Sequence, residues 1–197
     1  MNRDLKKARH RLLLIEATIA TIAESGITGA TVSNIVARAG LSRGMVHLHF
    51  RNKEELLIEA AKHFAEDYFD KLRARLERAG AAPKDRLEAL IEADLSEELL
   101  NETSIVVWYA LRGEARKLPG MMQYTTTRDA ALRDMFARLF LECLGGHAGD
   151  AARARDLAVG TIALLEGMWA DYFLFANSFN RQSAARIIKS LVLEPVA

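Results

Sequence analysis

Arg43 and His47 combine residue types and a spacing that indicate contact with an anionic partner. Four residues apart, they share one face of a helix. A guanidinium group offers a planar fork of donors that can bond two neighbouring acceptors at once, and an imidazole N–H can bond an anion. The surrounding charge agrees: residues 1–53 carry nine Lys and Arg against three Asp and Glu, whereas the remainder carries eighteen against twenty-three. This imbalance favours a module that binds a polyanion, although an uneven solvated surface would give the same counts.

The segments around these two residues predict two short helices joined by a tight turn. The first helix of this pair should start after Thr31, a good N-cap, and stop at Gly40, which accepts a positive φ. We expect Ser42 to cap the second helix, which runs to Phe50. Such a pair is typical of a helix-turn-helix, whose second helix enters the major groove of DNA.

The rest of the chain also reads as helix, because apolar residues recur at spacings of three and four throughout. A first helix over residues 7–25 ends at Gly26, and a long fourth helix starts at Asn52, with Glu55 at capping-box spacing, and ends near Gly80. Five more are expected over residues 83–101, 104–117, 120–144, 150–177 and 183–194. The prediction is an all-α chain of about nine helices: a three-helix helix-turn-helix domain over residues 1–53 and a helical ligand-binding and dimerisation domain over residues 54–197.

One segment resembles the DNA-binding domain of TetR-family repressors. The likeness covers residues 9–57 and rests on Thr31, the Ala-Gly-Leu-Ser turn at residues 39–42, Gly44, the His-Phe pair at residues 49–50 and Lys53. The resemblance implies contacts with the DNA backbone at the start of the second helix, base contacts from the third and a phosphate contact at the start of the fourth. His47 stands where the family usually has tyrosine. The implied DNA-binding residues are Thr31, Ser33, Ser42, Arg43, Gly44, Met45, His47, His49 and Lys53.

Aromatic residues gather in the second half of the chain, where they predict a small-molecule pocket between helices or simply a core. Glu166 interrupts the apolar run at residues 163–169, and a buried carboxylate needs a partner. That partner could be a basic residue across a dimer, water, or a cationic ligand held over the faces of Trp108 and Trp169. The candidate ligand-binding residues are Trp108, Tyr109, Tyr124, Phe136, Glu166, Trp169 and Phe173. Residues 136–144 and 163–169 resemble the branch of the family that represses choline-to-betaine synthesis, which implies choline as a ligand.

The last two predicted helices carry the expected homodimer contact. One face of the predicted eighth helix, residues 150–177, carries only the small residues Gly160, Ala163 and Gly167, so that another helix can approach it. The ninth has a compact apolar stripe of Ile187, Ile188, Leu191 and Val192. A dimer would place two recognition helices on a near-palindromic site in double-stranded DNA, with half-sites about 34 Å apart or a multiple of it.

Other function classes find little support in the residues. His47 and His49 point about 200° apart on a helix and cannot chelate one metal ion. No nucleophile–base pair, paired carboxylates or phosphate loop appears, so we expect no catalytic site and no cofactor. Charges interrupt the apolar runs and no signal-peptide core is visible, so we expect a cytoplasmic protein without membrane contact. The leading prediction is a repressor released from its operator by a small-molecule inducer. Two alternatives stay open: an architectural DNA-binding protein without an effector, and an enzyme that uses the aromatic pocket.

Overall fold

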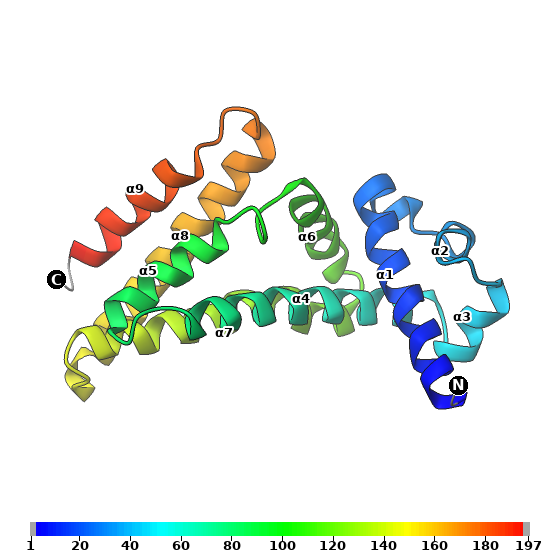
Figure 1. Ribbon diagram of the computed structural model, residues 1–197, viewed down its shortest axis with the longest axis horizontal. Helices are drawn as coiled ribbons and strands as arrows, with labels where there is room; N and C mark the ends of the chain where they lie inside the picture. The colour runs from blue at the N-terminus through cyan, green and yellow to red at the C-terminus, as the bar shows by residue number, and fades with distance from the viewer. Residues whose placement is uncertain (1–2, 195–197) are drawn as a thin grey trace. The chain divides into compact units, whose positions relative to one another are not determined.

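The computed structural model describes residues 3–194, except for the side chains of residues 126–129, and over this range the chain is helical (Figure 1). This confirms the predicted all-α class. The described residues form nine α-helices and one short 3-10 turn. Their bounds are α1 Arg3–Gly29, α2 Val32–Ala39, α3 Arg43–His49, α4 Lys53–Glu77, α5 Pro83–Asp94, α6 Glu102–Ala115, α7 Pro119–Cys143, η1 Ala148–Asp150, α8 Ala151–Phe175 and α9 Arg181–Leu193.

The helices form two compact units. The first contains residues up to 67 together with residues 103–126, and the second contains residues 68–102 and the chain from residue 127 onward. Helices α4 and α7 therefore each contribute to both units.

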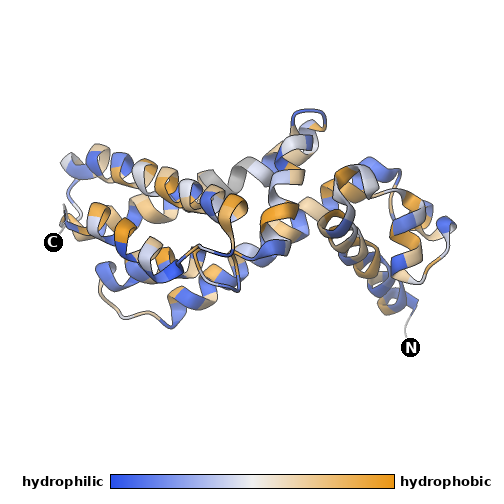
Figure 2. Cartoon of the chain, turned by 90° about the horizontal axis from the view of Figure 1, so that it is seen from above, coloured by the Kyte–Doolittle hydropathy of each residue, from blue (hydrophilic) through white to orange (hydrophobic). Residues whose placement is uncertain are grey.

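The first unit is built on α1, α2 and α3, which pack around one apolar core (Figure 1). Leu14 and Ile22 of α1, Ile35 of α2 and Val46 of α3 are all fully buried in it. Val107 of α6 belongs to the same core. Hydrophobic and hydrophilic residues alternate along the ribbon of these helices, as expected of amphipathic helices (Figure 2).

Local signals set the ends of the short helices largely as predicted. Thr31 Oγ1 accepts a hydrogen bond from the backbone N–H of Asn34 at 3.2 Å, and Gly40 adopts φ 65°, which confirms the N-cap and the turn. The prediction for Ser42 is wrong in one respect: Ser42 holds the N-cap position of α3, but its side chain makes no capping hydrogen bond. Gly26, with φ 68°, breaks α1 as expected, but a further turn follows it as far as Gly29.

Asn52 caps the long helix α4 through a hydrogen bond from the backbone N–H of Glu55 to Asn52 Oδ1 at 2.8 Å. The reciprocal half of the predicted capping box is shifted by one residue. The Glu55 carboxylate accepts from the backbone N–H of Arg51 at 2.6 Å instead. This hydrogen bond is the main reason that the pKa of Glu55 lies below its usual value.

The second unit contains α5, α8 and α9, with the adjoining parts of α4 and α7. Helix α5 ends at Asp94 rather than near residue 101, because turns follow it, and Ser96 Oγ donates to the carbonyl oxygen of Ala93 at 2.7 Å. Helix α9 is tied to α5 by Lys189, whose Nζ donates to Glu92 Oε1 at 2.7 Å. The carboxylates of Glu92 and Glu88 raise the pKa of Lys189, and the hydrogen bond to Glu92 contributes most.

Two described stretches, α1 and residues 148–175, are long and apolar enough to cross a membrane by length and composition alone. Acidic residues interrupt both stretches, Glu16 and Glu24 in α1 and Glu166 and Asp171 in residues 148–175. Core helices of soluble proteins satisfy the same test, and both stretches place residues in the helical cores, among them Leu14 of α1 and Leu165 of α8.

Candidate nucleic-acid interface and ligand site

Helix α3 presents a polar face to solvent. Arg43, Gly44 and His47 are exposed, while Val46 on the opposite side is fully buried. This is the orientation that a groove-reading helix needs, because the side chains that meet base edges must stand clear of their own domain. Leu48 is also 61% exposed, and sequence reasoning missed it. The signal was available: Leu48 lies two residues from both Val46 and Phe50, the inner residues of this helix, and therefore on its opposite side.

The structure brings two of the predicted DNA contacts together. The Arg43 guanidinium donates through Nη2 to Ser33 Oγ at 2.7 Å, and both side chains are exposed. This hydrogen bond joins α2 to α3 at the surface and orients the guanidinium. Thr31 and Ser42 are exposed at the starts of α2 and α3, and Lys53 is half-buried at the start of α4.

His49 lies in a different setting from Arg43 and His47. Its ring packs against that of His10 on α1, with ring centroids 6.2 Å apart and an edge-on angle of 86°. Both His49 ring nitrogens are buried and have no hydrogen-bond partner among the described residues. Burial lowers the pKa of His49, and the nearby charges of His10, Lys7 and Arg11 lower it further. Met45 is half-buried on the same side of α3, so neither residue belongs to the fully exposed face.

The aromatic candidates for a ligand site divide between the two units. Trp108, Tyr109 and Tyr124 belong to the first unit. Trp108 is 2% exposed and packs on Phe64 with ring centroids 5.8 Å apart. The guanidinium carbon of Arg112 lies 5.4 Å from the centre of the Trp108 ring, so a side chain of the protein already supplies a cation there.

Trp169 belongs to the second unit, where it contacts a carboxylate that sequence reasoning missed. Asp94 is fully buried at the end of α5. It accepts a hydrogen bond from Trp169 Nε1 at 2.8 Å and another from the hydroxyl of Tyr68. The rings of Tyr68 and Trp169 stand 6.5 Å apart at 73°. Three segments distant in the chain thus form what we call the Asp94 cluster: Tyr68, Asp94 and Trp169.

The sequence carried a signal for Asp94. Leu87, Leu90, Ile91 and Asp94 follow the i, i+3, i+4, i+7 spacing of a buried helix face, and all four are buried. By contrast Glu166, one turn before Trp169 on α8, is only half-buried. The fully buried carboxylate among the described residues of the second unit is therefore Asp94 rather than Glu166.

The remaining two candidates lie in dissimilar environments. Phe136 is fully buried and stacks on Phe140, with ring centroids 6.3 Å apart. Phe173 is 50% exposed near the end of α8.

The outer faces of α8 and α9 expose large apolar side chains. The expected close-approach residues of α8, Gly160, Ala163 and Gly167, are all exposed. The expectation for α9 is wrong at Ile188 and Val192, which are buried in the core of their own unit, so that α9 exposes a narrower stripe. The large exposed apolar residues of the two helices are Val159, Phe173, Leu174, Phe175, Ile187 and Leu191.

Comparison with known proteins identifies both parts of the chain. Residues 14–60 match the family of bacterial regulatory proteins of the tetR type, and residues 83–194 match the C-terminal domain of BetI-type transcriptional repressors. The HTH-type transcriptional regulator BetI of Paraburkholderia phytofirmans is 28% identical over 192 residues, which cover 96% of this chain and 93% of that protein.

Solved structures agree with this assignment. A transcriptional regulator from Pseudomonas aeruginosa PAO1 superposes with a TM-score of 0.83 at 27% identity, covering 100% of this chain and 92% of that one. A regulator from Saccharomonospora viridis, crystallised in complex with choline, shares the fold with a TM-score of 0.81 at 21% identity, covering 95% of this chain and 96% of that one. The chain belongs to the TetR family of bacterial transcriptional regulators and carries a C-terminal domain of the BetI type.

Proposed function

We propose that this protein is a repressor that binds a near-palindromic operator as a homodimer and leaves it when a small quaternary ammonium cation, such as choline, binds the second unit. The observation that carries the ligand assignment is the Asp94 cluster, a fully buried carboxylate beside the rings of Tyr68 and Trp169.

The chemistry of this cluster suits a cation that cannot donate strong hydrogen bonds. A desolvated carboxylate favours a positive charge nearby, and the faces of tryptophan and tyrosine attract quaternary ammonium groups within about 6 Å of the ring centre. Trp169 and Tyr68 supply the two rings, which contact each other edge to face with centroids 6.5 Å apart. Glu166, one turn from Trp169, adds a second negative group on α8. The BetI-type domain and the choline complex of the Saccharomonospora viridis regulator support the same choice.

The exposed face of α3 is the proposed reading surface for the operator. Arg43 matches the paired acceptors O6 and N7 of guanine, and its hydrogen bond to Ser33 holds it in place before DNA arrives. Thr31 and Lys53 would meet backbone phosphates, while Ser42, Gly44 and His47 face the groove and the half-buried Met45 lies at its edge. His49, packed against α1, would act on DNA only from the edge of this surface.

The exposed apolar faces of α8 and α9 are the proposed dimer contact. Leu174 is 67% exposed and Leu191 58% exposed in the single chain, and large apolar side chains exposed on two adjoining helices mark an interaction surface. The ligand then acts by binding more tightly to a form of the dimer in which the two helix-turn-helix domains, which we call the heads, no longer match the spacing of the operator.

The test begins with selection of duplexes from a random pool by the purified protein, followed by choline titration of the selected complex. Choline should release the wild-type protein. The Asp94→Asn variant should bind the same duplex but need far more choline for release. Asp171→Asn is the matched control, because it removes an exposed carboxylate from α8.

Two outcomes would contradict the proposal. Release of Asp94→Asn at the wild-type choline concentration would remove the cluster as the ligand site, and the absence of any choline effect on the wild-type complex would remove the ligand class. A milder variant, Trp169→Phe, keeps an aromatic ring in place and so tests the site even if Asp94→Asn folds poorly.

A further inference from the structure

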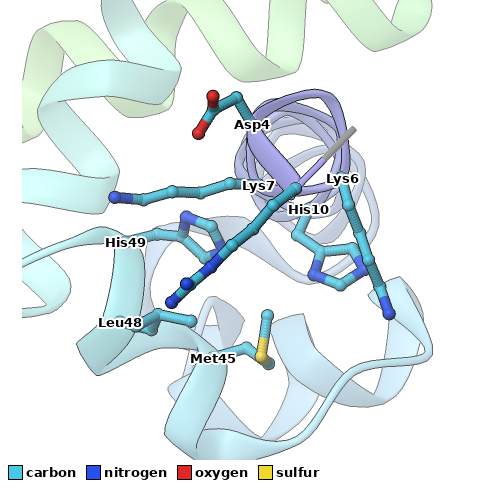
Figure 3. Close-up of a pocket in the computed structure, with 8 residues that line it drawn as sticks. Asp4, Lys6, Lys7, His10, Met45, Leu48 and His49 are labelled. Carbon is cyan, nitrogen blue, oxygen red and sulfur yellow. The ribbon is translucent and has the colours of Figure 1, made fainter. Parts of the chain in front are cut away.

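A basic pocket lies beside the recognition helix, between the first turns of α1 and the second half of α3 (Figure 3). Its volume is about 500 Å³. Figure 3 shows Lys6 and Lys7 extending from α1 on either side of the pocket, with the rings of His10 and His49 between them. Met45 and Leu48 of α3 complete the lining. We call this the α1–α3 pocket.

The charge of the lining selects an anion. Arg3, Lys6 and Lys7 contribute three cationic groups against the single carboxylate of Asp4. The imidazole of His10 adds a further N–H donor, while the ring of His49, whose nitrogens are buried, forms part of the wall. The apolar part of the lining, Met45 and the 61% exposed Leu48, suits carbon atoms next to the anionic group rather than a small hydrated ion. A sugar-phosphate chain has this combination of phosphate oxygens and sugar carbons.

The pocket is continuous with the exposed face of α3. At 3.6 residues per turn, Leu48 lies about 40° around the helix from Gly44, and Met45 about 60° beyond Leu48. The face that carries Arg43 and His47 therefore passes through Gly44 and Leu48 directly into the pocket. A duplex whose major groove receives that face has one of its strands at the groove edge, on the side of α1.

We propose that the α1–α3 pocket holds a stretch of the DNA backbone at the edge of the occupied major groove, with Lys6 and Lys7 donating to phosphate oxygens. The inference deepens the proposed function, because it rests on operator binding by α3. It adds to the recognition surface a set of α1 residues outside the helix-turn-helix. Their contribution is independent of sequence, since phosphate contacts position a protein without reading bases.

The experiment measures the salt dependence of binding to the selected duplex for the wild type, Lys7→Gln and the double variant Lys6→Gln/Lys7→Gln. Removing one phosphate contact lowers the slope of log K against log salt by about 0.9. Because both protomers of the homodimer carry the change, the double variant removes four contacts. Its slope should thus fall by about 3.6, and its deficit in affinity should shrink about 150-fold between roughly 50 and 200 mM salt. The matched control is Arg9→Gln, which removes an exposed cation of α1 that is not part of the pocket lining.

The results separate this inference from the proposed function. If the wild-type protein binds no selected duplex, both this inference and the proposed function fail. If the wild type binds but the lysine variants keep its slope, or weaken no more than Arg9→Gln, the α1–α3 pocket does not hold the backbone and the operator proposal stands. A decrease confined to the lysine variants, equal on the selected duplex and on a random duplex, supports the contact.

Discussion

Removing the Tyr68 hydroxyl should destabilise the second unit measurably. Tyr68 is 6% exposed, and its hydroxyl donates to the buried carboxylate of Asp94. The Tyr68→Phe variant keeps the ring beside Trp169 and loses only this donor, so the change isolates the hydrogen bond. A hydrogen bond to a charged group contributes about 1.5–3 kcal/mol, and leaving a buried acceptor short of a donor costs about as much.

The expected destabilisation can be measured as a shift in Tm. For a chain of this size, 1 kcal/mol lowers Tm by about 2–4 °C, so Tyr68→Phe should melt about 3–12 °C below the wild type. Protein concentration must be held constant, because dimerisation makes Tm concentration-dependent. Tyr172→Phe is the control. It also loses a hydroxyl from a buried ring of the second unit, but this hydroxyl makes no hydrogen bond to the described residues.

A double-mutant cycle shows whether the destabilisation belongs to the contact with Asp94. Tyr68→Phe should cost less in an Asp94→Asn background than in the wild type, with a coupling energy of about 1 kcal/mol or more. Strict additivity of the two changes, or a Tm for Tyr68→Phe equal to that of the Tyr172→Phe control, would refute the reasoning that this hydrogen bond stabilises the buried carboxylate.

Three further predictions concern the head and the dimer. Arg43→Ala should weaken operator binding by about 1–3 kcal/mol and relax one base preference, whereas Lys53→Ala should weaken binding to all duplexes alike; equal weakening on operator and random DNA for Arg43→Ala would exclude base reading. Since the folded state lowers the pKa of His49 below 6.5, the unfolded chain binds more protons just below that pH, and folding stability falls as pH falls through this range. His49→Gln should flatten that part of a plot of Tm against pH between about 7.5 and 5.5, and an unchanged plot would contradict the assignment. Leu191→Glu places a charge on the exposed stripe of α9 and should yield a monomer in sedimentation experiments at concentrations where the wild type is a dimer; a persistent dimer would place the interface elsewhere.

The short helices of the head were predictable because their ends depend on neighbouring residues. Thr31 caps α2 through an amide three residues away, and Gly40 alone supplies the positive φ of the turn. Ser42 shows the limit of such reasoning. Its residue type suits a cap, but the orientation of the hydroxyl depends on the packing of α3, which no local pattern specifies.

The Asp94 cluster was harder to predict, because its three residues are far apart in the chain. Asp94 lies on the apolar stripe of α5, but Tyr68 and Trp169 approach it only in the folded unit. Glu166 is the more conspicuous acidic residue in the sequence, because it interrupts a longer apolar run, but it is only half-buried. The same limit applies to α9, where the stripe was evident from the sequence but its division between core and surface was not.

The coupling between ligand and operator can be tested by a single calorimetric measurement, the affinity of the wild-type dimer for choline with and without saturating operator duplex. Linkage requires that choline bind more weakly to the DNA-bound dimer, by the same factor by which choline weakens operator binding. We expect a difference of about five- to 150-fold, the usual range of such couplings. Equal choline affinity in both states would contradict the central claim that ligand binding releases this repressor from DNA.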